Sequence, residues 1–199
     1  MVYFIEVSLR QQMAKHSTDL PSNSGLSNAS KAQLLLLDCD GVLTDGGVTW
    51  TEDGIEQKTF HIRDGLGIKL WQRAGFQVGI VTGRSSQVVK WRATELSIDF
   101  VKQGIGDKVA AVSELIAFCN LDWESVAYIG DDLPDLPVIR RVGFGVAVAD
   151  ACLEVQEASD FTTQLPGGKG AVRETVEVLL RSRGCWKNLI EQYQGNGIA

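Results

Sequence analysis

The sequence predicts an α/β fold with a mainly parallel sheet covered by helices on both faces. Three observations predict it: short, continuous apolar runs recur along the chain, each run ends in polar residues, and helix-like segments of about ten residues separate the runs. Continuous apolar runs bounded by turn residues are typical of strands that are buried on both faces. With 199 residues, the chain is long enough for one domain with a sizeable core.

The expected strands share one pattern, in which the residues after the apolar run carry reactive groups. Asp38 follows the first run, Thr82 the second and Gly130–Asp132 the third, and a weaker fourth run ends before Asp150. Because ligands bind outside the carboxyl ends of strands in open α/β sheets, we expect these residues to converge in one crevice. The four expected strands are residues 34–37, 78–81, 125–129 and 146–149.

The expected helices carry apolar residues at helical spacing, and one of them opens with a serine that can act as an N-cap. The expected helices are residues 67–74, 85–96, 107–119 and 171–181.

One segment breaks the alternation of strands and helices. Val48–Trp50 and Lys58–Phe60 flank the turn-rich Glu52–Gly54, which predicts a β-hairpin within a flap over residues 47–60.

The flanks of the predicted domain differ from it in composition. Polar residues rich in Ser, Asn, Asp and Gly predict a flexible leader over residues 1–31. The domain itself is expected over 32–183, and a C-terminal tail over 184–199, in which Gly195 and Gly197 favour flexibility.

Composition excludes several classes of protein. The net charge of −6 argues against a general nucleic-acid or membrane-surface binder, and no run approaches the roughly 20 apolar residues of a membrane helix. The four cysteines lie far apart without a CxxC pair, which indicates a reducing, cytoplasmic location and no zinc site.

Asp38 and Asp40 are the first candidate catalytic residues. Residues i and i+2 of an extended segment project to the same side, so two carboxylates can face one reacting group. One can attack phosphorus while the other transfers a proton. A bare Asp-x-Asp is also typical of loops and helix caps. A calcium-binding EF-hand loop does not fit, because Val42 occupies the third ligand position and a strand precedes the motif.

A second acidic cluster follows the third strand. Asp131, Asp132 and Asp135 offer hard oxygen ligands suited to Mg²⁺, although capping of a helix before Pro134 is an alternative. Beside Asp38 these carboxylates would repel one another unless a cation lay between them.

The other two candidate elements suit an anion. Thr82, Gly83 and Arg84 offer a hydroxyl, a backbone amide and a helix N-terminus to phosphate oxygens, with a simple serine cap at Ser85 as the alternative. Lys108, at the start of a helix, can neutralise phosphate and carboxylates, although a lone lysine is usually solvated.

Together these residues resemble the four motifs of the haloacid dehalogenase superfamily. Residues 38–46 resemble its first motif, DxDGxxTDG, and Thr82 and Lys108 match motifs two and three. Gly130–Asp135 matches motif four. Within the superfamily, four stretches resemble the 3-deoxy-D-manno-octulosonate 8-phosphate phosphatases, namely residues 54–60, 63–69, 127–133 and 167–174.

The resemblance implies a Rossmann-like three-layer fold without a separate cap domain, with the hairpin as a small flap, and a homotetramer in which hairpins help to close neighbouring sites. Asp150–Leu153 departs from the family's usual Asp-Ala-His-Pro, and Gln57 stands where leucine is common. Neither departure touches the catalytic set.

The implied activity is Mg²⁺-dependent hydrolysis of 3-deoxy-D-manno-octulosonate 8-phosphate, a small phosphorylated sugar acid, in the pathway for bacterial outer-membrane lipopolysaccharide. Two alternatives are a phosphatase for another sugar phosphate, such as a nine-carbon sialic-acid-type phosphate, and a silent oligomerisation module like that of sialic-acid cytidylyltransferases. The expected catalytic residues are Asp38, Asp40, Thr82 and Lys108; the expected metal-binding residues are Asp38, Asp40 through its carbonyl, Asp131, Asp132 and Asp135. Substrate binding is expected from Thr44, Arg63, Gly83, Arg84 and Arg173. The three arginines are candidates because guanidinium groups match carboxylate geometry, with a surface or helix-end charge as the alternative for each.

Overall fold

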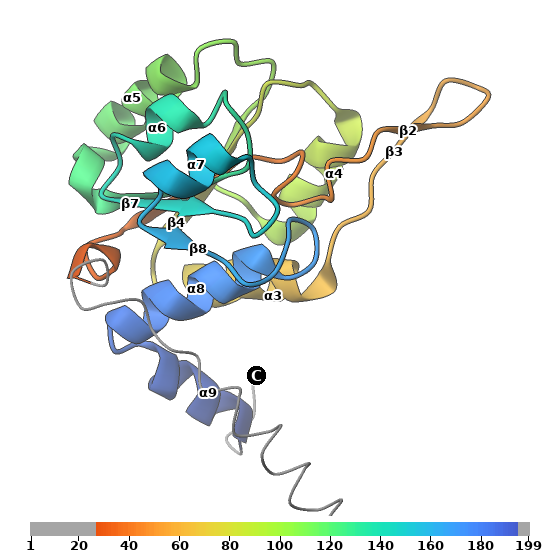
Figure 1. Ribbon diagram of the computed structural model, residues 1–199. Coiled ribbons are helices and arrows are strands. Elements are labelled where there is room, and N and C mark those ends of the chain that lie inside the picture. The colour runs from red at the N-terminus through yellow and green to blue at the C-terminus, as the bar shows by residue number, and fades with distance from the viewer. Residues whose placement is uncertain (1–26, 195–199) are drawn as a thin grey trace, which may run out of the picture.

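A six-stranded parallel sheet forms the centre of the computed structural model, which describes residues 27–194 (Figure 1). The strands lie in the order β5-β4-β1-β6-β7-β8, and every neighbouring pair is parallel. Their bounds are β1 Leu34–Leu37, β4 Gln77–Val81, β5 Phe100–Lys102, β6 Val126–Gly130, β7 Phe144–Ala147 and β8 Phe161–Thr162. The predicted α/β class with a parallel sheet is confirmed.

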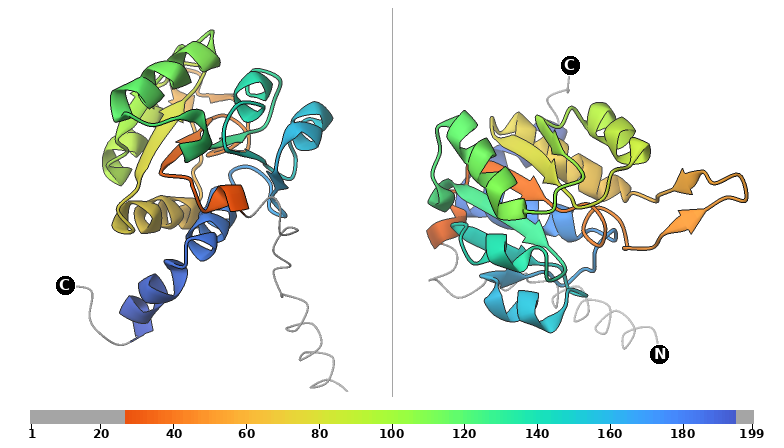
Figure 2. Two further views of the ribbon diagram at one scale, coloured as in Figure 1. Left: turned by 90° about the vertical axis from the view of Figure 1, so that its left-hand side faces the viewer. Right: turned by 90° about the horizontal axis from the view of Figure 1, so that it is seen from above.

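The helices form the outer two layers. α3 and α8 lie side by side on one face of the sheet, and α5, α6 and α7 cover the opposite face (Figures 1 and 2). The bounds are α3 Ile62–Arg73, α4 Gln87–Leu96, α5 Lys108–Cys119, α6 Leu136–Ile139, α7 Leu153–Ala158, α8 Ala171–Ser182 and α9 Trp186–Gln194, with a 3-10 turn at Trp123–Ser125. Within residues 27–194, none of these helices is long and apolar enough to cross a membrane.

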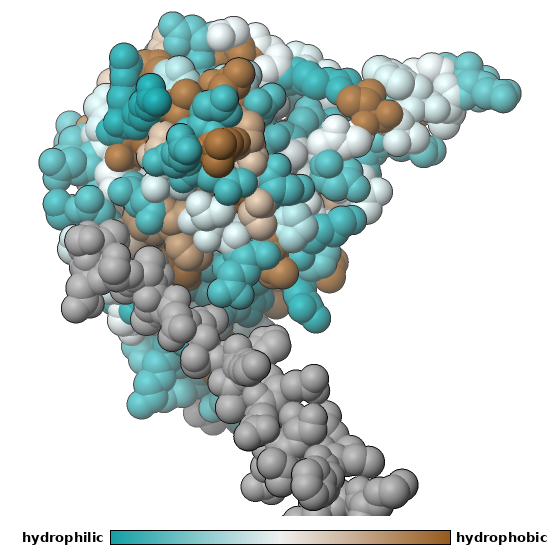
Figure 3. Space-filling view, viewed as in Figure 1, coloured by the Kyte–Doolittle hydropathy of each residue, from teal (hydrophilic) through white to brown (hydrophobic). Residues whose placement is uncertain are grey.

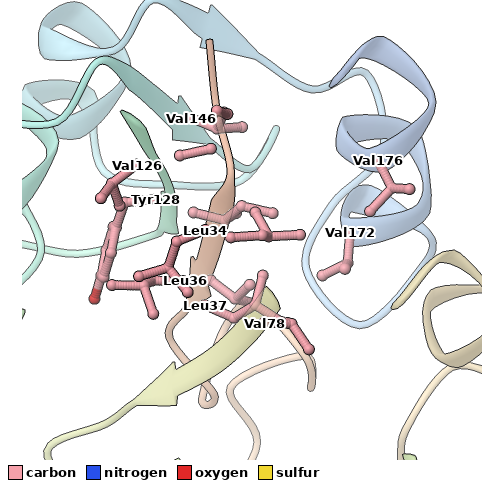
Figure 4. Close-up of a cluster of buried hydrophobic side chains, with 14 of the residues drawn as sticks. Leu34, Leu36, Leu37, Val78, Val126, Tyr128, Val146, Val172 and Val176 are labelled. Atoms are coloured by element: carbon pink, nitrogen blue, oxygen red, sulfur yellow. The ribbon is translucent and has the colours of Figure 1, made fainter. Parts of the chain in front are cut away.

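The core lies on both faces of β1, because all four leucines of this strand are fully buried. Val172 and Val176 of α8 face the strands from one side (Figure 4). β1 pairs with β4 on one side and with β6 on the other, so Leu37 lies between Ile80 and Ile129. The residues that follow these three strands are therefore neighbours at one edge of the sheet.

The hairpin of β2 (Thr49–Trp50) and β3 (Glu56–Gln57) projects from the body as an arm (Figures 1 and 3). The predicted second strand at 58–60 is displaced, because Trp50 pairs with Glu56 and the paired segment ends at Gln57. Lys58 lies at the base of the arm, where its side chain turns into the body.

Both predicted flanks differ from the expectation near the domain. Ala29 is fully buried, and Arg183 donates hydrogen bonds to the carbonyl groups of Ser30 and Ala32, so residues 29–31 pack on the domain instead of belonging to a separate leader. The rest of the predicted leader, residues 1–26, lies outside the described residues. The predicted tail contains α9, whose Leu189 is buried, whereas Gly195 and Gly197 lie outside the described part.

Asp64 of α3 caps the N-terminus of α8, which is more than a hundred residues away in the sequence. Its carboxylate accepts hydrogen bonds from the backbone N–H groups of Gly170 (3.2 Å) and Arg173 (2.8 Å). The side chain is almost fully buried, and burial raises its pKa in spite of these donors. This contact ties the two helices of one face together.

Replacing Asp64 with alanine is expected to lower the free energy of unfolding by about 1–3 kcal/mol, because two buried N–H donors lose their acceptor. Urea denaturation measures the change. Asp53→Ala, at the exposed tip of the hairpin, is the control and is expected to leave the midpoint unchanged. Equal midpoints for both variants would contradict the capping role.

Candidate active site

Asp38 lies directly after β1 and forms an ion pair with Lys108. The backbone N–H of Asp38 donates to the Ile129 carbonyl at 3.0 Å and so extends the pairing of β1 with β6. Its side chain is only 9% exposed, and its Oδ1 lies 2.9 Å from Lys108 Nζ. The carboxylate is therefore fixed by the sheet on one side and by a cation on the other.

Lys108 is the first residue of α5, and its ammonium group joins two carboxylates. Asp107 caps this helix by accepting from the N–H of Ala110 at 3.0 Å. The lysine Nζ lies 2.6 Å from Asp135 Oδ1 and 2.9 Å from Asp38 Oδ1. Burial alone would lower the pKa of Lys108, but the two carboxylates raise it above its ordinary value. The lysine is therefore charged, in contrast to the solvated lysine of the alternative interpretation.

Three carboxylates meet at this edge of the sheet. One oxygen each from Asp38, Asp131 and Asp135 lies within 4.8 Å of the others. Apart from its ion pair, the buried Oδ1 of Asp38 accepts no hydrogen bond from the part of the chain that the structure describes. Hard oxygen donors around an under-coordinated carboxylate oxygen fit Mg²⁺.

The electrostatics of the metal-free cluster indicate the same need for a cation. Burial raises the pKa of Asp131 to about 8, and repulsion by Asp38 and Asp135 adds to the shift. Burial and repulsion by Asp135 raise the pKa of Asp38 to about 6, although Lys108 opposes the shift. A divalent cation would favour the charged form of both carboxylates.

Asp135 is fully engaged by the protein. Its Oδ1 accepts from Lys108 and from the hydroxyl of Tyr128, the latter at 2.6 Å, and its Oδ2 accepts from the N–H groups of Asp131 (3.1 Å) and Asp132 (3.4 Å). These bonds orient Lys108 and the loop after β6. Tyr128 was missed by sequence reasoning, because an aromatic residue in a buried strand gives no signal beyond packing.

Asp132 is not brought into the cluster. It is exposed, and its Oδ1 accepts from the N–H of Leu133 at 2.8 Å, as in a local cap. The sequence pattern places all three acids in one group, but only Asp131 and Asp135 lie beside Asp38.

Two glycines allow the loops to come this close. Gly41 has a φ of +87°, and a Cβ there would lie 2.0 Å from Asp131 Oδ2. At Gly130, a Cβ would lie 2.4 Å from the Cβ of Asp135. Side chains at these positions would push the acidic groups apart, so the glycines of both motifs are steric requirements.

The loop after β4 supplies the anion-binding candidates. Thr82 is buried; its N–H donates to the Lys102 carbonyl at 3.0 Å and its carbonyl accepts from Ile105 at 3.1 Å. Gly83 is exposed. Arg84 Nη2 donates to Glu56 Oε1 at 2.8 Å, and Arg84 Nε lies 4.0 Å from Asp40 Oδ2. In the structure, Arg84 therefore lies beside Asp40, the predicted general acid and base.

The other expected substrate-binding residues lie differently. Thr44 is buried in the turn after β1, where its hydroxyl donates to the Cys39 carbonyl at 3.4 Å. Arg63 is exposed, and its side chain makes no hydrogen bond or ion pair with residues 27–194. Arg173 pairs with Glu177 at 2.9 Å and stacks on Trp186, so within this chain its guanidinium group is engaged by α8 and α9.

Asp40 contacts a residue that sequence reasoning did not single out. Lys58, from the base of the hairpin, donates a short hydrogen bond to Asp40 Oδ1, and the lysine side chain is only 1% exposed. The contact joins residues 18 positions apart, and no sequence pattern signals it.

The high pKa of Asp131 leads to a prediction for the metal-free protein. The unfolded chain holds this proton only up to a pKa near 3.8, whereas the folded protein holds it up to about 8. Between these values the folded state binds more protons, so stability falls as the pH rises. Asp131→Asn is expected to make the free energy of unfolding less dependent on pH, by an amount that corresponds to at most one bound proton. It is also expected to remove the stabilisation by Mg²⁺. Denaturation in EDTA and in Mg²⁺, from pH 5 to 8, measures both effects.

Asp132→Asn is the matched control for this experiment, because Asp132 is the exposed neighbour in the same loop. It is expected to keep both the slope and the response to Mg²⁺. An Asp131→Asn protein that is still stabilised by Mg²⁺ to the full extent would exclude Asp131 from the metal site.

Comparison with known proteins identifies the class that this fold and site define. Residues 86–172 match the family model described as haloacid dehalogenase-like hydrolase. The parallel sheet, with its acidic residues at the ends of adjacent strands, agrees with that class.

The chain belongs to the 3-deoxy-D-manno-octulosonate 8-phosphate phosphatase family of these hydrolases. It is 42% identical to the phosphatase KdsC of that name from Escherichia coli K12 over 159 residues, which cover 80% of this chain and 85% of the relative. A crystal structure of the Moraxella catarrhalis enzyme with a magnesium ion, a phosphate ion and a KDO molecule is 38% identical, with a TM-score of 0.85, over 86% of this chain and 99% of that one. A probable YrbI family phosphatase from Pseudomonas syringae pv. phaseolica is 42% identical, with a TM-score of 0.87, over 88% and 100% of the two chains.

Proposed function

We propose that this protein is a Mg²⁺-dependent phosphomonoesterase that hydrolyses 3-deoxy-D-manno-octulosonate 8-phosphate to the free sugar acid and phosphate through a phospho-aspartate on Asp38. The observation that carries the proposal is the position of Asp38, a buried carboxylate between Lys108 and the acids of the loop after β6, in a chain of this family. Magnesium, when bound, offsets the charge of the phosphoryl group and of the carboxylates around it.

In the first step, an oxygen of Asp38 attacks phosphorus, and the bond from phosphorus to the sugar oxygen breaks. Asp40 gives its proton to that oxygen, so the sugar leaves as an alcohol. In the second step, a water molecule loses a proton to Asp40 and attacks the phosphorus of the acyl phosphate. The bond to Asp38 breaks, which releases inorganic phosphate and restores the enzyme.

The positions of the other site residues indicate their roles in metal binding, charge stabilisation and substrate binding. Asp38, Asp131 and the backbone carbonyl of Asp40 would hold the metal, while Asp135 orients Lys108 and the loop. Lys108 and Thr82 would stabilise charge on the transferring phosphoryl group. Arg84 is the substrate-binding candidate that lies beside Asp40, and Gly83 precedes it in the loop after β4.

A homotetramer in the cytoplasm, in the pathway for lipopolysaccharide, completes the proposal. The exposed apolar side chains of Val48, Trp50 and Ile55 on the hairpin support an oligomer, because an isolated two-stranded hairpin is marginally stable in water. The four cysteines are all free thiols, which fits a reducing compartment.

The deciding test is phosphate release, with Mg²⁺, from a panel of phosphorylated sugars that includes the eight-carbon and nine-carbon sugar-acid phosphates. Strong preference for the eight-carbon acid is the expected result. Equal release from many esters would overturn the substrate and leave the chemistry. Absence of release from every ester would overturn the enzymatic function.

A further inference from the structure

Lys58 has a buried charged side chain that the proposed reaction does not use. Its side chain is 1% exposed although it leaves the base of a projecting hairpin, and its ammonium group donates to Asp40 Oδ1. Burying an ammonium group is costly unless anions compensate for it. A lysine with no role beyond packing usually extends its charge into solvent.

Glu56 supplies the second anion and connects Lys58 to the loop after β4. Glu56 Oε1 lies 3.6 Å from Lys58 Nζ and accepts from Arg84 Nη2 at 2.8 Å. Its other oxygen accepts a short hydrogen bond from the Ser86 hydroxyl. The result is a chain of alternating charges that runs from Asp40 through Lys58 and Glu56 to Arg84.

This chain fixes the base of the hairpin between two strand ends. Asp40 belongs to the segment after β1, whereas Arg84 and Ser86 belong to the segment after β4. Within residues 27–194, the carboxylate of Asp40 has two cationic neighbours, Lys58 and Arg84. Lys58 holds Oδ1, and the other oxygen, Oδ2, lies on the side of Arg84, at 4.0 Å from its Nε.

We propose that Lys58 is a positioning residue that fixes the carboxylate of Asp40 in the orientation needed for proton transfer, with Glu56 as the anchor of Lys58. The inference rests on the acid/base role proposed for Asp40. It makes the hairpin base part of the catalytic geometry, because withdrawal of Lys58 frees the acid/base to rotate away from the reacting oxygen.

Lys58→Met keeps the length and apolar stem of the side chain and removes the ammonium group. We expect kcat for the sugar-acid phosphate to fall by about 100-fold, as is typical of a displaced catalytic group, with KM changed by less than about threefold. Glu56→Gln keeps Lys58 in place but weakens its anchor, so a smaller fall in kcat is expected. Lys90→Met, on the exposed surface of α4, is the matched control and is expected to retain wild-type kinetics.

A double-mutant cycle separates positioning from a general effect on folding. If Lys58 acts through Asp40, the loss caused by Lys58→Met disappears when Asp40 is already asparagine, so the double variant is expected to equal Asp40→Asn within about threefold. The proposal would be overturned if the loss of kcat in the double variant equalled the product of the losses in the two single variants. A Lys58→Met enzyme with wild-type kcat would overturn it as well. Lys58→Gln provides the same cycle if the methionine variant does not fold.

The wild-type rate distinguishes this inference from the function on which it rests. A wild-type enzyme that releases phosphate, together with a multiplicative cycle, overturns the role of Lys58 alone. A wild-type protein that hydrolyses no phosphate ester overturns the proposed function and the positioning role together.

Discussion

Asp38→Asn is expected to lower the rate of phosphate release by at least about 10⁴-fold, because the amide cannot form the phospho-enzyme and the loss of a nucleophile is among the largest single effects in catalysis. No other side chain can readily take over the attack, because Asp38 is held in a fixed, buried position. Asp38 is fixed by the pairing of β1 with β6, and its Oδ1 is buried against Lys108. Acid-quench trapping of labelled phosphate on the protein is the direct measurement, and the asparagine variant is expected to carry none.

Asp53→Asn, an equal change of charge at the exposed tip of the hairpin, is the control and is expected to keep the wild-type rate. The Asp38→Asn protein is expected to remain folded, because removal of one anion relieves repulsion from Asp135. Mg²⁺-dependent turnover in the folded asparagine variant, above a few parts in ten thousand, would exclude Asp38 as the nucleophile.

Gly167→Ala is expected to give the second large loss, through sterics instead of chemistry. A Cβ at this position would lie 1.7 Å from the carbonyl oxygen of Gly41, which belongs to the turn after β1. The loop cannot simply move away: Gly168 donates to the Val42 carbonyl at 2.9 Å, and the Gly167 N–H donates to Asp150 Oδ1 at 2.9 Å. We therefore expect about 3 kcal/mol of destabilisation, the upper end of overpacking costs, and about a 100-fold loss of kcat.

Gly106→Ala is the matched control, since the same methyl group meets nothing within 4 Å there and the backbone needs no positive φ. Urea denaturation and kinetics on both variants measure the two effects. Two alanine variants with equal stability and activity would show that the turn after β1 tolerates displacement, against the close contact seen here.

The sequence predicted the reactive residues of the site better than the residues that hold them in place. Asp38, Thr82 and Asp131 were predicted to converge because strand ends are marked by apolar runs, and the parallel register of β4, β1 and β6 places these ends side by side. Lys108 was predicted to neutralise carboxylates at this site, but its contact with Asp135, 27 positions away, was not predicted.

Elements with a weak apolar signal were missed. β5 has three residues, none of them fully buried, and β8 has two, so neither forms an apolar run. α6 has four residues and α7 has six, too few for a periodic pattern. α9 was assigned to the tail although its apolar residues pack against α8, because the contact is tertiary.

Side-chain partners that lie far apart in the sequence could not be predicted from it. Arg173 is a different case: it was expected to bind substrate, but within this chain it pairs with its i,i+4 neighbour Glu177 and lies over the ring of Trp186. Lys58 and Asp64 make their decisive contacts with Asp40 and with the start of α8, and each depends on how the folded elements meet.

The placement of the reactive groups after three adjacent strands has a consequence for how such an enzyme can change. Strand spacing, about 4.8 Å in any sheet, fixes the distances between nucleophile, anion-binding loop and metal ligands. The hairpin of β2 and β3 lies outside that framework, in a separate two-stranded sheet. Substrate preference can therefore be redesigned by exchanging residues 48–55 of the hairpin, with Glu56 and Lys58 kept at its base, on a core that continues to perform phosphoryl transfer. The molecule thus separates the groups that carry out phosphoryl transfer from the hairpin that can select the leaving group.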